Sequence, residues 1–336
     1  MMLQEINRIS ALLGQDPLII QGGGGNISLK DPTSNSIWVK ASGKWLKYAN
    51  TENIYVELDL KKGQAWLESR EAKFPENWSK SIHPLRPSIE TSLHLLFGQK
   101  VVIHSHPVSI LSQSAQSNGE ELLKQQLTGL IWAYLPYVMP GNDLANAISE
   151  HPLFGQCEIF ILKNHGLITC GKDAETAYTL TLDVLKRCQT PVRPFAETNF
   201  SLANSADNSK QFSNDYYWAK HQQIHSLVLD PISLSYFDQD NNVLYPDQAV
   251  FLGKNALFID TPNQITSGVS LPFLLIRNQG VLIHKNASPM VEQMLACHAE
   301  ILARIPVGVP LNYLSDYQVS QLSNWDAEKY RESINR

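Results

Sequence analysis

Two histidines that follow a short apolar run over residues 101–103, His104 and His106, are the first indication of chemistry in this chain. Side chains alternate between the faces of a strand, so both imidazoles are predicted to point the same way and Ser105 the opposite way. Neutral imidazole is a common zinc ligand, and the pair therefore indicates half of a metal site. The alternative is one hydrogen-bonded core histidine and one surface histidine, because so short a motif also arises by chance.

A carboxylate is available just before this strand. Residues 86–97 carry an early proline and an apolar stripe, which predicts a helix that begins at Pro87 and ends at Gly98. A helix followed directly by the strand can place Glu90 beside the two imidazoles. His94 lies four residues further on, hence on the same helix face, and we interpret it as a packing residue or as one that supports a ligand.

A third imidazole, His165, lies at the tip of a predicted turn. Residues 158–162 predict a buried strand, Lys163–Gly166 a turn, and residues 167–169 a second strand. Asp173 is then predicted to cap a helix over residues 174–187. A lone histidine in a turn usually has no special role, but three imidazoles and one carboxylate make a complete tetrahedral ligand set.

Two small polar turns are predicted at the ends of neighbouring strands. Gly22–Gly25 precedes a predicted strand over residues 26–30, and residues 36–40 predict a second strand that runs into Ala41–Lys44. Four consecutive glycines are costly in backbone entropy within a helix or strand, whereas in a turn their N–H groups can converge on an anion. The alternative is a flexible surface loop. The two turns together indicate the walls of a phosphate or sugar pocket.

The other segments of the first half predict the elements that hold these residues in place. Apolar residues 3–13 predict an N-terminal helix that Gly14 ends, and residues 54–60 predict a strand. Residues 61–80 indicate a polar hairpin and loop. Further along, we expect helices over residues 119–135 and 143–148, with a short strand and turn over residues 137–141 between them.

The second half is predicted to be a smaller unit after a linker. Residues 191–215 are rich in Pro, Asn, Ser and Asp and indicate the linker, so the predicted domains are 1–190 and 216–336. The latter predicts strands near 243–260 and 271–284 and a helix over residues 288–304. Phe273–Ile283 matches Phe160–Ile168 in pattern, which indicates a degenerate internal repeat, although strand–turn–strand–helix is also a common local solution. Gln279 replaces His165 in it, so the second copy is expected to bind no metal.

Composition excludes several classes of protein. The 336 residues are 43% hydrophobic and 18% charged, which is typical of a globular protein with an ample core. A net charge of −5 without any Lys/Arg cluster argues against a nucleic-acid partner. No signal-peptide pattern and no membrane-length apolar run is present. The four cysteines lack paired spacing and suit a reducing compartment, so we expect a cytoplasmic protein with no membrane partner.

The order of these motifs resembles the class II aldolase/adducin superfamily. They are the Gly-rich turn with Asn-x-Ser, Val-Lys-Ala-Ser-Gly, Pro-Ser-x-Glu, His-x-His-Pro and Asn-His-Gly, within about residues 1–190. The versions at residues 22–26 and 38–43 are most similar to the aldolase portion of bifunctional rhamnulose-phosphate aldolase/dehydrogenases. The C-terminal unit lacks the glycine-rich nucleotide fingerprint that such a dehydrogenase needs.

The resemblance implies an α/β fold, three layers deep (α/β/α), with a central, mainly antiparallel sheet between helices. The C-terminal unit lies outside the resemblance, and its own pattern predicts a smaller α/β extension. The resemblance implies a homo-oligomer, commonly a tetramer, and a sugar or sugar-phosphate substrate. It also implies that Zn²⁺ or another divalent metal is held by Glu90, His104, His106 and His165. Glu90 would double as the catalytic acid/base. Phosphate would bind at Gly25, Asn26, Ser42, Gly43 and Ser88. Two departures, Gly23 and Ile89, remove hydroxyls that sugar-phosphate aldolases commonly carry.

The leading hypothesis is a zinc-dependent lyase of carbohydrate catabolism that cleaves a ketose or ketose 1-phosphate by retro-aldol chemistry. Zinc as a Lewis acid stabilises the charge left when a C–C bond beta to a carbonyl breaks, and a carboxylate can move the proton. An epimerase, dehydratase or decarboxylase would use the same site. An adducin-like scaffold is the alternative without catalysis. A zinc isopeptidase fits less well, because Ser117 stands where its aspartate is required.

Overall fold

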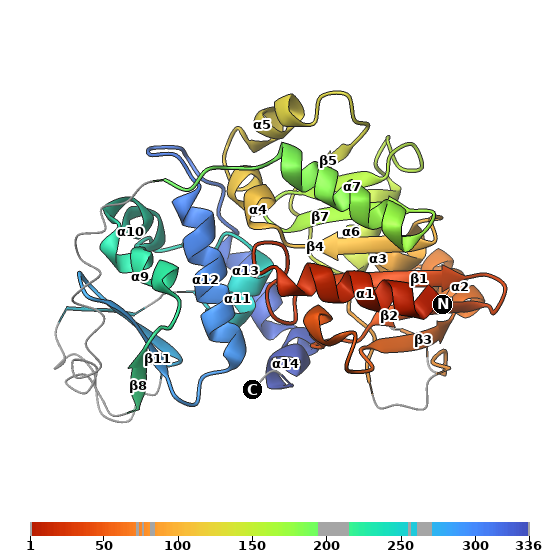
Figure 1. The fold of residues 1–336 in the computed structure, drawn as a ribbon, viewed down its shortest axis with the longest axis horizontal. Helices are drawn as coiled ribbons and strands as arrows, with labels where there is room; N and C mark the ends of the chain where they lie inside the picture. Colours follow the sequence, from red (N-terminus) through yellow and green to blue (C-terminus); the bar gives the residue numbers. More distant parts are fainter. Residues whose placement is uncertain are drawn as a thin grey trace. The chain divides into compact units, whose positions relative to one another are not determined.

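The computed structural model describes residues 2–71, 74–75, 77–80, 85–193, 215–254, 257–260 and 271–334. They form two compact units (Figure 1). The N-terminal unit comprises residues 1–114 and 118–189, and the C-terminal unit comprises residues 115–117 and 190–336. Most of the predicted linker, residues 194–214, lies outside the described residues, and the domain boundaries at 190 and 216 stay a prediction. Among the described helices, none has the length and apolar character to cross a membrane.

A seven-stranded sheet forms the centre of the N-terminal unit, in the order β3-β2-β1-β4-β7-β6-β5. All neighbours are antiparallel except β5 and β6, so the predicted α/β fold with a mainly antiparallel sheet is confirmed. The strands are β1 (Asn26–Asp31), β2 (Ser36–Lys40), β3 (Tyr55–Asp59), β4 (Val101–Ser105), β5 (Ala133–Leu135), β6 (Ile159–Leu162) and β7 (Gly166–Gly171).

Helices cover both faces of this sheet, because alternate side chains of the buried strands point to opposite faces. On one face Val101 and Ile103 of β4 pack against α1 and α7, which lie together in Figure 1. On the other face Val102 packs with residues of α3 and α6. The helices of this unit are α1 (Met2–Gln15), α2 (Leu60–Ser69), α3 (Thr91–Leu96), α4 (Val108–Ser114), α5 (Gly119–Gln126), α6 (Asn142–Ser149) and α7 (Ala174–Arg187), with a 3-10 turn η1 (Leu46–Tyr48).

The polar hairpin and loop predicted for residues 61–80 is wrong over its first half, which forms α2. Asp59 caps this helix by accepting a hydrogen bond from the N–H of Lys62. The buried ring of Trp66 then packs at 4.9 Å from Phe74 and at 5.6 Å from Trp78, measured between ring centroids. Packing of Trp66 in this aromatic cluster stabilises α2, and the polar composition of residues 61–80 gave no indication of it.

Two other predicted boundaries are also wrong. The helix expected from Pro87 begins only at Thr91, because the chain at Pro87 is extended and forms a bridge with Ala41. The helix expected over residues 119–135 ends at Gln126, and Gly129 turns the chain with a φ of 86° into β5. Residues 137–141, where we predicted a strand, form none.

The C-terminal unit contains a four-stranded sheet in the order β8-β11-β10-β9. The pair β10–β11 and the helix α12 confirm their predictions, whereas residues 243–254 do not form the predicted strand, because Pro246 starts a helix there. The strands are β8 (Tyr216–Trp218), β9 (Phe258–Ile259), β10 (Phe273–Ile276) and β11 (Gly280–His284). The helices are α9 (Gln222–Leu229), α10 (Pro231–Phe237), α11 (Pro246–Phe251), α12 (Pro289–Ala303), α13 (Asp316–Asn324) and α14 (Asp326–Ser333).

Strands β8-β11-β10-β9 have the same order of pairing directions as β4-β7-β6-β5, with two antiparallel pairs followed by a parallel one. The two tight turns also agree. Asn164 and Asn278 have φ of 56° and 58°, and the glycines two residues later, Gly166 and Gly280, have φ of 158° and 146°. This agreement is what an internal repeat requires, and common descent of the two copies stays a prediction.

The correspondence shows which residues replace the predicted ligands in the C-terminal unit. When the two turns are aligned, Leu282 on β11 corresponds to Ile168 on β7. Leu282 pairs with Trp218 and Ile168 pairs with His104, so Trp218 takes the place of His104. Gln279 takes the turn position of His165. An indole and an amide are not the ligands that zinc prefers, so we expect the second copy to be metal-free.

Candidate metal centre and anion-binding turns

The first two imidazoles of the candidate site come from the end of β4. His104 is fully buried, and its Nδ1 lies 3.1 Å from the carbonyl oxygen of Leu167 on β7. A carbonyl can only accept, so Nδ1 carries the proton and a neutral ring then leaves its Nε2 lone pair for another partner. His106 lies just beyond the strand, with its Nε2 3.0 Å from His104 Nε2. The predicted pairing of the two imidazoles on one face is therefore present.

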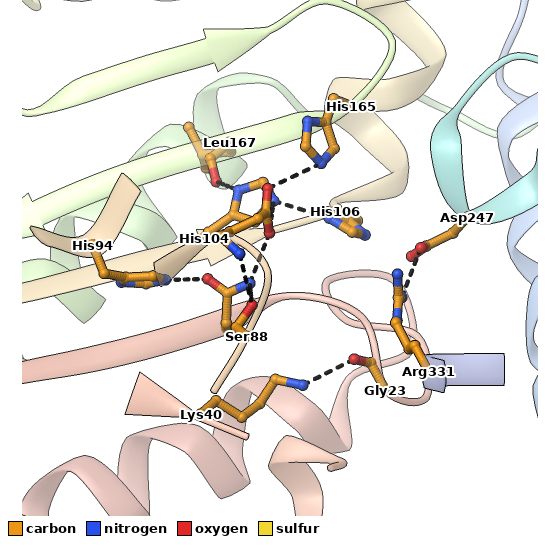
Figure 2. Close-up of polar contacts among 12 residues, drawn as sticks. Gly23, Lys40, Ser88, His94, His104, His106, His165, Leu167, Asp247 and Arg331 are labelled. Atoms are coloured by element: carbon orange, nitrogen blue, oxygen red, sulfur yellow. Dashed lines mark hydrogen bonds and ion pairs between the residues drawn. The ribbon is translucent and has the colours of Figure 1, made fainter. Parts of the chain in front are cut away.

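The third imidazole reaches this face because the turn between β6 and β7 packs tightly on β4. A Cβ atom at Gly166 would lie 2.2 Å from the carbonyl oxygen of Ser105, so only glycine allows this approach. The approach brings His165 to the cluster. The candidate ligand atoms of His104, His106 and His165 all lie within 4.8 Å of one another (Figure 2).

Glu90 completes the set from the residue just before α3. Its Oε2 lies 3.5 Å from His104 Nε2 and accepts a hydrogen bond of 2.8 Å from the side-chain amide of Asn26. Its Oε1 lies 3.6 Å from His165 Nε2 and accepts no hydrogen bond from the described residues. Burial alone would raise the pKa of Glu90, but the nearby imidazoles and the Asn26 amide lower it to about 2. The carboxylate is thus ionised at neutral pH.

These four side chains fit a divalent metal. Three imidazole nitrogens and one carboxylate oxygen are a donor set that zinc takes in proteins. A buried carboxylate oxygen without a donor is costly, and a cation beside Oε1 would remove that cost. The Leu167 carbonyl fixes the orientation of the His104 ring, as second partners of metal-binding histidines commonly do.

His94 lies outside the imidazole cluster. Its ring contacts the side chains of Asn26 and Ser28 on β1, and it is fully buried. Burial lowers the pKa of His94 to about 3, so its ring is neutral at ordinary pH. The sequence analysis placed His94 and Glu90 on one helix face. Glu90 lies just before α3, and its carbonyl oxygen accepts the hydrogen bond from the N–H of His94, so the two residues are one helical turn apart and both side chains contact Asn26.

The predicted phosphate-binding residues lie on neighbouring segments, and two of them, Asn26 and Ser88, adjoin Glu90. Gly25, with a φ of 57°, lets the first turn approach β4, since a Cβ there would lie 2.9 Å from the His104 carbonyl oxygen. Asn26 Nδ2 lies 3.4 Å from Ser88 Oγ. The second turn, Ser42-Gly43, runs alongside the same segment, because Ser42 N–H donates to the Arg86 carbonyl and Ser88 N–H donates to the Lys40 carbonyl. Phosphate binding there stays a prediction.

Lys40 is a residue that the sequence analysis missed. Its buried ammonium donates a hydrogen bond of 2.9 Å to the carbonyl oxygen of Gly23 (Figure 2). It also donates one of 2.6 Å to the carbonyl oxygen of Lys44 and so connects the two turns. A positive charge between the two turns raises the local electrostatic potential, which is the condition that binding of an anion would require. The available signal was a lysine directly before the Ala-Ser-Gly turn, at the end of a predicted strand.

A separate cavity of about 620 Å³ lies elsewhere in the N-terminal unit. Residues of α1, β2 and β3 line it, among them Asn7, Trp38 and Glu57. It contains none of the predicted site residues.

Comparison with known proteins identifies the family. A sequence model of the Class II Aldolase and Adducin N-terminal domain matches residues 4–192, more than half of the chain. The chain belongs to the class II aldolase and adducin family. The resemblance seen in the motifs is therefore confirmed, and the match spans all of the residues predicted to bind metal and phosphate.

Relatives within the class II aldolase and adducin family carry different names. The uncharacterized oxidoreductase YuxG of Bacillus subtilis is 31% identical over 201 residues, which cover 56% of this chain and 29% of that protein. The chain thus matches less than a third of the length of that relative. An L-fuculose phosphate aldolase of Methanococcus maripaludis is 29% identical over 179 residues, which cover 49% of this chain and 82% of that protein.

Solved structures of class II aldolase domains are similar at low identity. The N-terminal class II aldolase domain of a protein from Thermoplasma acidophilum is 25% identical with a TM-score of 0.47, over 55% of this chain and 91% of that one. An L-fuculose 1-phosphate aldolase is 16% identical with a TM-score of 0.41, over 56% and 82%. The family assignment rests on the sequence match and not on these similarities.

Proposed function

We propose that this protein is a zinc-dependent aldehyde-lyase that cleaves a ketose or ketose 1-phosphate by retro-aldol chemistry in carbohydrate catabolism. The observation that carries the proposal is the buried carboxylate of Glu90 among three imidazoles, with Oε1 accepting no hydrogen bond from the described residues. The family includes L-fuculose phosphate aldolases, which gives this reaction precedence over others. Glu90, His104, His106 and His165 are the proposed metal ligands.

Retro-aldol cleavage requires one proton to leave a substrate hydroxyl and one proton to arrive on carbon. The C–C bond beta to the ketone breaks, the hydroxyl carbon becomes an aldehyde, and the ketone fragment gains the proton. A divalent metal bound at the four side chains would supply Lewis-acid stabilisation of the negative charge on the substrate oxygen. Glu90 is ionised at neutral pH, and we propose that it moves the proton.

The two polar turns are proposed to hold the substrate's anionic group. Gly25, Asn26, Ser42, Gly43 and Ser88 are the proposed contacts. The hydrogen bonds that connect the turns support this proposal, because the same segment that carries Ser88 leads directly into Glu90. Binding energy at the phosphate would orient the reacting carbons at the metal centre.

Other assignments in our predictions remain proposals of the same kind. We propose a cytoplasmic homo-oligomer that acts on a small sugar or sugar phosphate. Four buried cysteines, none of them in a disulfide, are consistent with a reducing compartment. An epimerase, dehydratase or decarboxylase would use the same metal ligands. An adducin-like scaffold is disfavoured by the presence of all four candidate ligands in one buried cluster.

The test is a cleavage assay on the purified full-length protein with zinc supplied. A panel of ketose 1-phosphates and the matching free ketoses is incubated with it, and dihydroxyacetone phosphate or dihydroxyacetone is measured. The proposal expects release that EDTA abolishes and zinc restores. If two ketoses interconvert and no cleavage fragments are released, the protein is an epimerase and not a lyase. Wild-type protein that holds no divalent metal after zinc is supplied would favour the scaffold.

A further inference from the structure

The strongest unexplained feature of the site is a chain of buried side-chain contacts from α3 to Glu90. His94 Nε2 hydrogen-bonds Asn26 Oδ1, and His94 Nδ1 lies 2.8 Å from Ser28 Oγ. The amide nitrogen of Asn26 faces the other way, at 2.8 Å from Glu90 Oε2 and 3.4 Å from Ser88 Oγ. Both His94 and Asn26 are buried, so water does not compete for these groups.

Donor and acceptor chemistry fixes the direction of this chain. The carboxylate of Glu90 can only accept, so the NH₂ end of Asn26 must face it. Asn26 Oδ1 then faces His94 and can only accept, so His94 Nε2 must donate whether the ring is neutral or charged. A flipped amide would set two acceptors against each other at Glu90, so the carboxylate fixes the orientation of the amide. With Asn26 Oδ1 facing it, His94 carries its proton on Nε2, and Nδ1 accepts from the hydroxyl of Ser28 when the ring is neutral.

We propose that His94 is a positioning residue that locks the Asn26 amide so that it presents only N–H donors at the site. One N–H holds Glu90 Oε2, which leaves Oε1 directed toward His165. The other N–H donates to Ser88 Oγ over a long distance of 3.4 Å, and an anionic oxygen of the substrate would share or replace this acceptor. Donors without acceptors suit an anionic oxygen, such as that of a phosphate monoester, and disfavour a neutral hydroxyl. The inference deepens the proposed function, since it selects the phosphorylated ketose.

The test uses phosphate binding, which does not require a known sugar substrate. Titration calorimetry measures the affinity of the zinc-loaded full-length protein for inorganic phosphate. His94→Leu removes the donor but keeps an apolar side chain of moderate size. Because a hydrogen bond to a charged group is lost or misdirected, we expect about 10-fold or more weaker phosphate binding with the metal content unchanged. His94→Gln can still donate to Asn26 and should bind within about threefold of wild type.

Two further variants separate positioning from packing. Ser28→Ala removes the contact at Nδ1 without touching the donor to Asn26 and should bind phosphate within about twofold of wild type. Asn26→Asp is isosteric but replaces the donors with an acceptor, so its phosphate binding should be at least as weak as that of His94→Leu. If His94→Leu fails to fold, Asn26→Asp still tests whether the N–H donors of Asn26 are needed for phosphate binding. Equal phosphate affinity in wild type and Asn26→Asp would overturn the inference.

Other outcomes are equally decisive. If His94→Gln binds as weakly as His94→Leu, bulk and not the donor is what matters, and the inference is wrong. If wild type binds no phosphate, the site does not select an anion. If phosphate binding follows the expected order but no ketose is cleaved, the role of His94 stands and the proposed lyase function fails.

Discussion

Glu90 Oε1 lies 3.6 Å from His165 Nε2, although the two residues lie far apart in the sequence. Glu90 directly precedes α3, and His165 lies at the tip of the turn between β6 and β7. An ionised carboxylate oxygen that accepts no hydrogen bond from the described residues is unfavourable in a protein interior. A divalent cation among the four side chains would satisfy it, and the following predictions test this arrangement.

Metal content should depend on the turn that carries His165 in the N-terminal unit. It should not depend on the corresponding turn of the C-terminal unit, which carries Gln279. We expect about one zinc per chain in the wild type and nearly none in His165→Ala after dialysis against a weak chelator, because one of four ligands is lost. Gln279→Ala changes the equivalent turn position and is the matched control, which should keep the zinc. Mass spectrometry of the metal measures both. Full zinc in His165→Ala would contradict the assigned ligands.

Removing the charge of Glu90 should stop proton transfer. Glu90→Gln keeps the size of the side chain, and we expect kcat for the cleaved ketose to fall by about 10²- to 10⁴-fold. The amide can neither accept the proton nor carry the charge that the imidazoles stabilise. Glu158→Gln, at an exposed position beside β6, is the control and should keep wild-type kcat. Unchanged turnover in Glu90→Gln would remove this residue from the mechanism.

The convergence of the ligands was predictable from local rules. Strand alternation places His104 and His106 together, and the Asn-His-Gly sequence fits a tight turn with Asn164 and Gly166 at unusual φ angles. The start of the helix beside Glu90 was predicted too early, since the helix begins after this residue. Pro87 is held extended by its bridge to Ala41, and a pairing partner so distant in sequence leaves no local signal.

Features that depend on tertiary contacts escaped the sequence analysis. Lys40 was not expected inside, because lysine side chains are normally exposed, and hydrogen bonds to groups such as the carbonyl oxygens of Gly23 and Lys44 make its burial tolerable. The helix α2 depends on the packing of Trp66 against rings that follow it in the chain. In both cases the partner groups cannot be identified from periodicity.

The close approach of Gly166 to β4 should make this position intolerant of any side chain. In Gly166→Ala the new Cβ would meet the Ser105 carbonyl oxygen at 2.2 Å, at a φ of 158°. We expect the turn to move away from β4, with a loss of about 2 kcal/mol or more in the free energy of unfolding and a large loss of zinc affinity. Chemical denaturation and zinc titration measure the two effects. Wild-type values for both would show that the turn is not what positions His165.

Lys30 should make stability of the N-terminal unit rise with pH. Its buried ammonium donates to the carbonyl oxygens of Phe97, at 2.5 Å, and Gln99, at 3.0 Å. Burial lowers the pKa of Lys30 to about 8, against a smaller opposing effect of Cys170. Between about pH 8 and the ordinary lysine pKa the unfolded chain keeps this proton and the folded chain loses it. Folding is then favoured by up to about 1.4 kcal/mol per pH unit as pH rises.

The measurement compares wild type with Lys30→Met by urea denaturation at pH 7.5 and pH 9.5. The difference in free energy of unfolding should move in favour of wild type by about 2 kcal/mol, because only the wild type gains from releasing the proton on folding. Lys61→Met removes an exposed lysine and corrects for the change in net charge. A difference between wild type and Lys30→Met that stays constant or shrinks with pH would mean that Lys30 keeps its proton in the folded chain. The two carbonyl groups would then stabilise the ammonium more than burial destabilises it.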